Sequence, residues 1–328
     1  MGQFRRRQFL VAAGTLLAAP IAARAQPTQK IHRIGVLTQA IPQKSFVALP
    51  AALRELGYEE GRNFVFDYRF ANYQASRLPE LAAGLVAAKV DLIVAVTNPE
   101  ILAAKRATST IPIVMLAGLV PVEMGIVASL GRPGGNLTGT VIVDPGAAGK
   151  TLQMLRDAVP RASRMFLLVD EAGFPGMDLY NRMARRAAAS MGIRLTQLQV
   201  GSVAELDAAF DRILRERPDA LIVVYGSATL RQHLARVIEF AARERLPVIY
   251  TNKAPVLEGG LMSYNCDYAA LFARTAAIVD RVLKSANPGE IPIEQPTKYE
   301  LVINMKTAKA LGLTVPPSVL LRADQVIE

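Results

Sequence analysis

Short apolar segments of strand length alternate with longer amphipathic segments along most of this 328-residue chain. Residues 91–96 form an almost continuous apolar run, which is typical of a parallel strand covered on both faces. In residues 76–88 the leucines Leu78, Leu81 and Leu85 are spaced by three and four positions, as on one face of a helix. Strands separated by helices predict βαβ units and therefore parallel sheets.

The number of these units predicts two lobes. Further strand-length segments lie at residues 31–37, 63–70, 113–116, 137–143, 165–169, 194–200, 220–224 and 247–250. One sheet with so many strands would be too wide, so we expect an α/β fold of two doubly wound parallel-sheet lobes. Clusters of Pro and Gly near residues 132–146, 254–260 and 287–292 would let the chain cross between the lobes three times. Three crossings predict a hinge on which the lobes close around a ligand.

The first 25 residues have the pattern of an export signal. Three arginines at positions 5–7 precede a short apolar stretch, which ends in the A-x-A motif of residues 23–25. This pattern predicts a signal peptide that is cleaved after Ala25, and it places the mature protein in the periplasm. The arginine pair, followed by a Phe-Leu pair, favours the twin-arginine route. The general secretory route stays open, and an N-terminal anchor helix is the alternative to cleavage.

Composition excludes several classes of protein. The chain has one cysteine, Cys266, and two histidines, His32 and His233, which argues against a disulfide framework and against a cysteine- or histidine-based metal site. No basic run follows residue 7, so we expect no nucleic-acid partner despite the formal net charge of +10. No phosphate loop, dinucleotide fingerprint or nucleophile elbow is complete, so we expect no cofactor and no enzymatic activity. An exported α/β enzyme without a recognisable catalytic motif stays as the alternative.

Several sequence segments resemble those of a known family. They include GIVASLGRPGGNLTG at residues 125–139, GGLMSY at residues 259–264, and PTKYELVIN at residues 296–304. Together with similar stretches elsewhere they cover nearly all of residues 31–328 in the expected order. The chain resembles the substrate-binding proteins of ABC transporters, in the family that contains tryptophan-binding and related amino-acid-binding members.

This resemblance implies a fold, a lobe division and a function. The fold is that of type I periplasmic binding proteins. Its N-lobe would take residues 31–142 plus 261–285, and its C-lobe would take residues 143–258 plus 288–328. The implied function is that of a solute receptor of an ABC importer, which closes on an amino acid or a related carboxylate and delivers it to the membrane permease subunits.

The expected N-lobe site follows from the architecture. Ligands of open α/β sheets lie beyond the carboxyl ends of the strands, where helix N-termini favour a carboxylate. Gln39, Thr97, Asn98 and Gly118 follow three expected N-lobe strands. Thr97 and Asn98 are also typical helix-capping residues, and capping is compatible with binding. Gly118 would let a ligand approach the backbone closely.

In the C-lobe, Asp170, Tyr225 and Asn252 follow three further expected strands. An amino-acid ligand needs an acid for its ammonium group, and Asp170 or Asp267 would supply one. Tyr225 would stack on an apolar or aromatic ligand. We therefore expect a ligand site between the lobes, with no residue performing chemistry.

Overall fold

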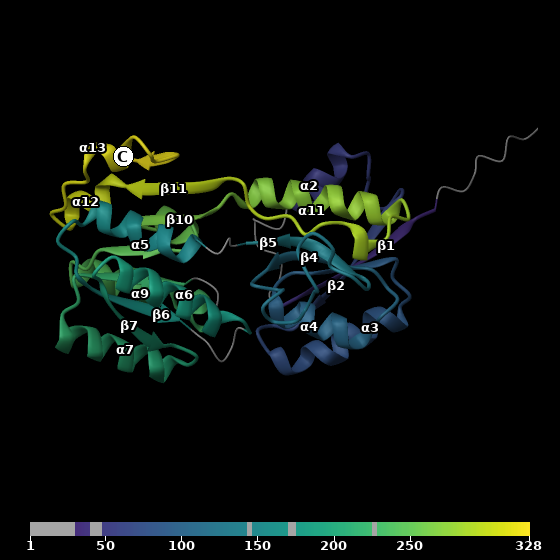
Figure 1. Cartoon of the computed structure of the whole chain (residues 1–328), viewed down its shortest axis with the longest axis horizontal. Coiled ribbons are helices and arrows are strands. Elements are labelled where there is room, and N and C mark those ends of the chain that lie inside the picture. Colours follow the sequence, from purple (N-terminus) through teal and green to yellow (C-terminus); the bar gives the residue numbers. More distant parts are fainter. Residues whose placement is uncertain (1–29, 40–47, 143–145, 170–174, 225–227) are drawn as a thin grey trace, which may run out of the picture.

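The computed structural model describes residues 30–39, 48–142, 146–169, 175–224 and 228–328. Two sheets lie side by side along the long axis of the molecule, each with its own helices (Figure 1). The prediction of an α/β fold with two doubly wound lobes is confirmed. Among the described residues, no helix is both long enough and apolar enough to cross a membrane.

The N-lobe contains a five-stranded sheet with the order β2-β1-β3-β4-β5. Its strands are β1 (His32–Thr38), β2 (Phe64–Phe70), β3 (Leu92–Ala95), β4 (Ile113–Gly118) and β5 (Leu137–Val141). Its helices are α2 (Ala48–Glu55), η2 (Ala75–Arg77), α3 (Leu78–Ala87), α4 (Asn98–Ala107), α11 (Tyr268–Leu283) and η3 (Pro288–Glu290).

The C-lobe contains a seven-stranded sheet with the order β12-β11-β10-β9-β8-β6-β7. Its strands are β6 (Arg164–Val169), β7 (Arg194–Gln199), β8 (Ala220–Val223), β9 (Val248–Tyr250), β10 (Met262–Cys266), β11 (Tyr299–Asn304) and β12 (Gln325–Ile327). Its helices are α5 (Ala147–Ala158), α6 (Met177–Ser190), α7 (Val203–Glu216), α8 (Ala228–Gln232), α9 (Leu234–Arg243), α10 (Ala254–Leu257), α12 (Met305–Ala310) and α13 (Pro317–Leu320).

Each sheet is covered on both faces by helices, which is why its inner strands, such as β3, β4 and β8, consist of apolar residues. In the N-lobe, α2 and α11 cover one face and α3 and α4 cover the other. In the C-lobe, α5 and α6 pack against one face, and α7 and α9 against the other. All four residues of β3 are buried, as expected for a central parallel strand. Burial of this apolar surface is the main stabilising contribution to each lobe.

One strand pair departs from the parallel pattern. β10 is parallel to β9 but antiparallel to β11. The chain leaves the C-lobe after β10, builds α11 in the N-lobe, and returns as β11 from the opposite end of the sheet (Figure 1). The antiparallel pair therefore follows from the path of the chain between the lobes.

Two of the expected lobe boundaries are wrong. Residues 261–285 were expected together in the N-lobe, but β10 pairs with strands of the C-lobe sheet, and only α11 packs against α2 and β4. The C-lobe was expected to resume at residue 288, but residues 288–294 lie on the N-lobe. Gly134 N donates to Gly289 O (3.1 Å) and Ile293 N donates to Leu130 O (2.7 Å). Of the described residues, the N-lobe thus holds 30–142 and 268–294, and the C-lobe holds 146–266 and 299–328.

Candidate functional site

A buried carboxylate joins the two N-lobe loops that sequence analysis singled out. Glu100 is 1% exposed and lies in the first turn of α4. Gln39 N donates to its Oε1 (2.8 Å), while Thr97 N (3.2 Å) and the Thr97 hydroxyl donate to its Oε2. The Glu100 side chain therefore holds the loop after β1 and the loop after β3 together.

The environment of Glu100 is unusual for a carboxyl group. Burial raises the pKa of Glu100 above its ordinary value, although the hydrogen bonds from Thr97 and Gln39 act in the opposite direction. Thr97 is the N-cap of α4 and forms a capping box with Glu100. The T-x-x-E spacing was visible in the sequence, so Glu100 is a residue that the capping pattern predicts and that our site analysis missed.

Asn98 makes contacts in both lobes. It is fully buried, and its side chain binds both backbone groups of Leu119: Nδ2 donates to Leu119 O and Oδ1 accepts from Leu119 N, each at 2.8 Å. Its Nδ2 also donates to Pro175 O in the C-lobe (2.8 Å). The Leu119 side chain in turn belongs to the buried apolar cluster of the C-lobe core. Asn98 was expected to bind ligand; its amide is instead occupied by a contact between the lobes.

The backbone around this contact is strained and tightly packed. Val120, a β-branched residue, has a φ of 43°, in the left-handed region that such residues rarely adopt. Gly176 on the C-lobe side has a φ of 91°, and a Cβ there would lie 2.8 Å from Met124 Sδ. Glycine at this position lets the lobes approach each other. Strain of this kind persists where the surrounding structure enforces it, and it is frequent at ligand sites and switches.

Gly118, expected to admit a ligand, ends β4 inside the N-lobe. A Cβ on Gly118 would meet Met115 Sδ at 3.3 Å and Thr140 O at 3.5 Å. Its carbonyl accepts a hydrogen bond from Ile142 N (3.0 Å). The side of Gly118 that a Cβ would occupy is therefore covered by protein.

On the C-lobe side, two of the expected residues, Asp170 and Tyr225, lie outside the described residues. Asn252 is half-buried, and its Oδ1 accepts from Ala254 N (2.9 Å) at the start of α10. Its side chain is also hydrogen-bonded to Tyr268, the first residue of α11. Asn252 thus links a C-lobe loop to the point where the chain enters the N-lobe.

Asp267, expected as a partner for a ligand ammonium, caps α11. Its Oδ1 accepts from Ala269 N (3.0 Å) and Ala270 N (3.2 Å), and its Oδ2 lies 3.3 Å from Lys298 Nζ. Burial acts to raise the pKa of Asp267, but the backbone donors and Lys298 hold it below its ordinary value. The carboxylate is already neutralised by protein groups, which makes it a poor partner for a second cation.

Two residues that sequence analysis did not select also meet between the lobes. Tyr73 follows β2 in the N-lobe, and Arg231 lies on α8 in the C-lobe. The guanidinium carbon of Arg231 is 6.0 Å from the centre of the Tyr73 ring. No motif marks either residue, because the contact joins positions 158 residues apart whose meeting depends on the fold of both lobes.

Two observations concern metal binding and the reactivity of the single cysteine. They contain no group of three or more His, Cys, Asp or Glu side chains arranged to hold a metal ion. Burial raises the pKa of the Cys266 thiol to about 12, with a smaller contribution from the charge of Asp267. A thiol with so high a pKa is protonated at neutral pH and is a weak nucleophile.

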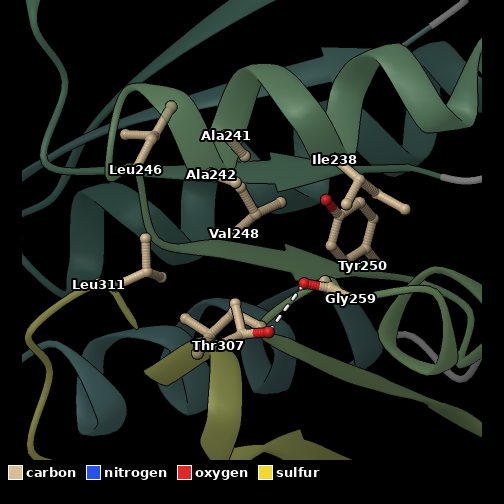
Figure 2. A pocket seen from close by; sticks show the side chains of 11 residues that line it. Ile238, Ala241, Ala242, Leu246, Val248, Tyr250, Gly259, Thr307 and Leu311 are labelled. Carbon is tan, nitrogen blue, oxygen red and sulfur yellow. Dashed lines mark hydrogen bonds between the residues drawn. The ribbon is translucent and has the colours of Figure 1, made fainter. Parts of the chain in front are cut away.

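A separate small cavity lies in the C-lobe, where residues of α9 form part of its lining (Figure 2). It has a volume of about 10 Å³, enough for about one water molecule and far too small for an amino acid. Apolar side chains dominate its lining, and the Thr307 hydroxyl at its edge donates to Gly259 O (2.8 Å). The lining residues are Ile238, Ala241, Ala242, Leu246, Val248, Tyr250, Gly259, Gly260, Leu261, Thr307 and Leu311.

Known proteins share both the sequence pattern and the fold. The tyrosine-binding protein of Clostridioides difficile (strain R20291) is 28% identical over 268 residues, which cover 80% of this chain and 74% of that protein. The crystal structure of an ABC domain from Streptococcus pneumoniae in complex with L-Trp is 26% identical, with a TM-score of 0.83 over 91% of this chain and 100% of that chain. A conserved domain protein from Vibrio cholerae O1 biovar El Tor has the same identity of 26% and TM-score of 0.83, over 90% of this chain and 100% of that chain.

The family assignment rests on most of the chain. Residues 43–327 match the sequence profile of the family described as ABC transporter substrate binding protein. That span includes the C-lobe sheet, strands β2 to β5 of the N-lobe sheet and all three passages between the lobes, whereas β1 (His32–Thr38) precedes it. The resemblance noted from the sequence is confirmed: the chain belongs to the family of ABC transporter substrate-binding proteins.

Proposed function

We propose that this protein is the solute receptor of an ABC importer, which holds a small molecule between its lobes and delivers it to the membrane permease. The observation that carries the proposal is the contact from Asn98 in the N-lobe to Pro175 in the C-lobe. It joins loops at the carboxyl ends of strands, the region where open α/β sheets hold ligands. A receptor needs such contacts to favour its closed state, and it needs no catalytic group.

The ligand we propose is an amino acid or a related carboxylate, with aromatic amino acids as the first candidates. Two relatives support this choice, since one is named for tyrosine and the other was crystallised with L-Trp. Tyr73 and Tyr268, at the lobe interface, offer aromatic surface from the N-lobe. Aromatic rings on a ligand pack favourably against such residues.

Export to the periplasm is part of the proposal, and it rests on the first 25 residues of the sequence, which lie outside the described residues. We expect the mature protein to begin at Gln26. N-terminal sequencing of protein recovered from the periplasm tests this directly. Replacement of Arg6 and Arg7 by lysine should block export by the twin-arginine route, and an unchanged yield would indicate the general secretory route.

Binding is tested on the mature protein, residues 26–328. Native mass spectrometry of protein recovered from cells identifies any small molecule that co-purifies. Isothermal titration calorimetry with L-tyrosine and L-tryptophan then measures affinity, and small-angle X-ray scattering reports whether the ligand makes the protein more compact. We expect micromolar or tighter binding by at least one of them, with a decrease in the radius of gyration. Binding of neither amino acid, together with a co-purified ligand that lacks a carboxylate, would refute the proposed ligand class.

A further inference from the structure

Arg231 extends its charge from the C-lobe toward two tyrosines of the N-lobe. Its guanidinium carbon lies 6.0 Å from the ring centre of Tyr73, at the far end of the range for a cation–π contact. Its charge also acts on Tyr268, where it opposes the larger effect of burial, which raises the pKa of that hydroxyl. Tyr73 follows β2 and Tyr268 begins α11, so the charge of Arg231 acts on residues of two separate N-lobe elements.

The hydrogen-bonding capacity of Arg231 is not used up. Its Nε is buried and has no hydrogen-bond partner in the described part of the chain. No carboxylate of the described residues lies within ion-pair distance of it, whereas its neighbour Arg236 is paired with Asp207 (2.5 Å). A buried N–H without an acceptor is destabilising, and such groups in folded proteins call for an explanation.

Tyr73 is held in place at an energetic cost. Tyr73 and the preceding Asn72 have φ values of 60° and 52°, in the left-handed region that is rare for a large side chain. Tyr73 N donates to Gln39 O (2.8 Å), and Gln39 N is in turn bound by the buried Glu100. The backbone that carries the ring facing Arg231 is therefore fixed by the same network that orders the expected N-lobe site.

From these observations we propose that Arg231 binds the carboxylate of the ligand when the lobes close, with the Tyr73 ring beside it. This inference rests on the proposed function, because it assigns a residue and a ligand group to the same interlobe site. Guanidinium has five N–H donors in a planar fork that matches the two oxygens of a carboxylate. A carboxylate supplies the acceptor that the Nε lacks, and the aromatic ring accommodates an apolar group attached to it.

The experiment compares two ligands on three variants of the mature protein. L-Tyrosine carries a carboxylate, and L-tyrosinamide replaces it with a neutral amide of nearly the same shape. Calorimetry, extended to weak binding by NMR titration, measures both affinities on the wild type, Arg231→Gln and Arg231→Lys. Arg236→Gln is the matched control, because that arginine lies on the neighbouring helix and is paired within the C-lobe. Thermal unfolding confirms that each variant is folded.

We expect the wild type to prefer tyrosine over tyrosinamide by at least about thirtyfold, which corresponds to a charged contact that is buried on closure. Arg231→Gln should lose most of this preference, Arg231→Lys should keep part of it, and Arg236→Gln should keep all of it. Equal weakening of both ligands by Arg231→Gln would make Arg231 a contact between lobes only and would overturn the inference. An unchanged preference would overturn it as well.

A third probe separates this inference from the proposed function. 4-Hydroxyphenylacetate carries the ring and the carboxylate but no ammonium group. If the wild type binds it through Arg231 and does not bind tyrosine, the inference stands and the amino-acid assignment fails. If the wild type binds none of the three probes and the co-purified ligand is a molecule without an anionic group, the inference fails and the receptor function stands.

Discussion

The two lobes begin their sheets with the same device. In the N-lobe, Asp91 directly precedes β3, and its Oδ2 accepts from Arg33 N at the start of β1 (2.7 Å). In the C-lobe, Asp219 directly precedes β8, and its Oδ2 accepts from Arg164 N at the start of β6 (2.8 Å). In both cases the aspartate joins neighbouring parallel strands at their amino ends. The same aspartate contact thus occurs in both sheets, at the end where the strands begin.

The lobes differ at the other end of the sheets. Thr97 is the N-cap of α4, and Glu100 in the first turn of that helix is 1% exposed, whereas Ser202 is the N-cap of α7, and Glu205 in its first turn is exposed. Thr97 and Glu100 form a capping box, and Ser202 and Glu205 form a related cap, in which Glu205 Oε2 accepts from Gly201 N (2.6 Å) and Ser202 Oγ accepts from Glu205 N (3.2 Å). Burial changes what the motif does. In the C-lobe it caps a helix, and in the N-lobe it also fixes a neighbouring loop of the expected site.

The largest predicted effect comes from the buried capping box. Glu100→Ala leaves Gln39 N, Thr97 N and the Thr97 hydroxyl without their acceptor, and we expect it to lower the free energy of unfolding by about 2–4 kcal/mol. Glu205→Ala is the matched control in the C-lobe, and it should cost only about 0.5 kcal/mol because water can replace the exposed carboxylate. Urea unfolding measures both values. Equal losses would show that burial makes no difference between the two motifs.

The next prediction concerns the contact between the lobes. Asn98→Ala removes the bonds to Leu119 and to Pro175, and it should lower the free energy of unfolding by about 2 kcal/mol. Without ligand, the variant should also have a larger radius of gyration in X-ray scattering, because its lobes lose a shared hydrogen bond. Asn136→Ala is the control, since Asn136 Nδ2 donates to Ile111 O (2.7 Å) within the N-lobe. That variant should lose stability without opening, and identical radii for the two variants would contradict the interlobe role of Asn98.

The fold was largely predictable because its signal is local. Apolar runs such as β3 and the leucine spacing of α3 are visible in windows of ten residues, and they led to two doubly wound lobes. The two wrong boundaries concern pairing over long distances. β10 alternates apolar and polar residues, a strand pattern that fits the sheet of either lobe, and residues 288–294 become part of the N-lobe through backbone bonds to residues 130–141. Neither partner is specified by local sequence.

The site was predictable only in part, for the same reason. Sheet topology correctly indicated that Thr97 and Asn98 follow a strand and begin a helix. What Asn98 binds depends on Leu119 and Pro175, which are 21 and 77 residues away. The meeting of Tyr73 with Arg231 likewise requires both lobes to be folded and in contact.

The repeated aspartates predict a matching pH dependence in the two lobes. Burial acts to raise the pKa of Asp91 and of Asp219, but Lys30 and the Arg33 N–H in the first case, and the N–H groups of residues 163 and 164 in the second, hold both pKa values below the ordinary 3.8. A carboxyl group whose pKa is lowered by folding contributes its full stabilisation at pH values above the ordinary pKa. This contribution is lost as the pH falls through the lowered pKa.

Asp91→Asn and Asp219→Asn should therefore each cost about 1 kcal/mol at neutral pH, after allowance for solvent screening of these partly exposed groups. The difference in free energy of unfolding between each variant and the wild type should shrink as the pH falls from 5 to 2. Urea unfolding across that range measures it. A loss confined to one lobe, or one that grows toward low pH, would show that the two aspartates are not equivalent.

The smallest predicted effect contrasts two buried tyrosines. Tyr58 in the N-lobe donates to Asp280 Oδ1 (2.9 Å), whereas the hydroxyl of the fully buried Tyr250, on the wall of the C-lobe cavity, has no partner in the described part of the chain (Figure 2). Tyr58→Phe should cost about 1 kcal/mol because Asp280 loses a donor. Tyr250→Phe should leave the free energy of unfolding unchanged or raise it by up to about 0.5 kcal/mol, since it removes a buried polar group that makes no bond. Thermal unfolding of both variants gives the comparison. A loss of stability in Tyr250→Phe as large as that in Tyr58→Phe would mean that a water molecule in the cavity binds the Tyr250 hydroxyl. In that case the buried tyrosines of both lobes are hydrogen-bonded, and the contrast between the lobes is confined to the ligand site.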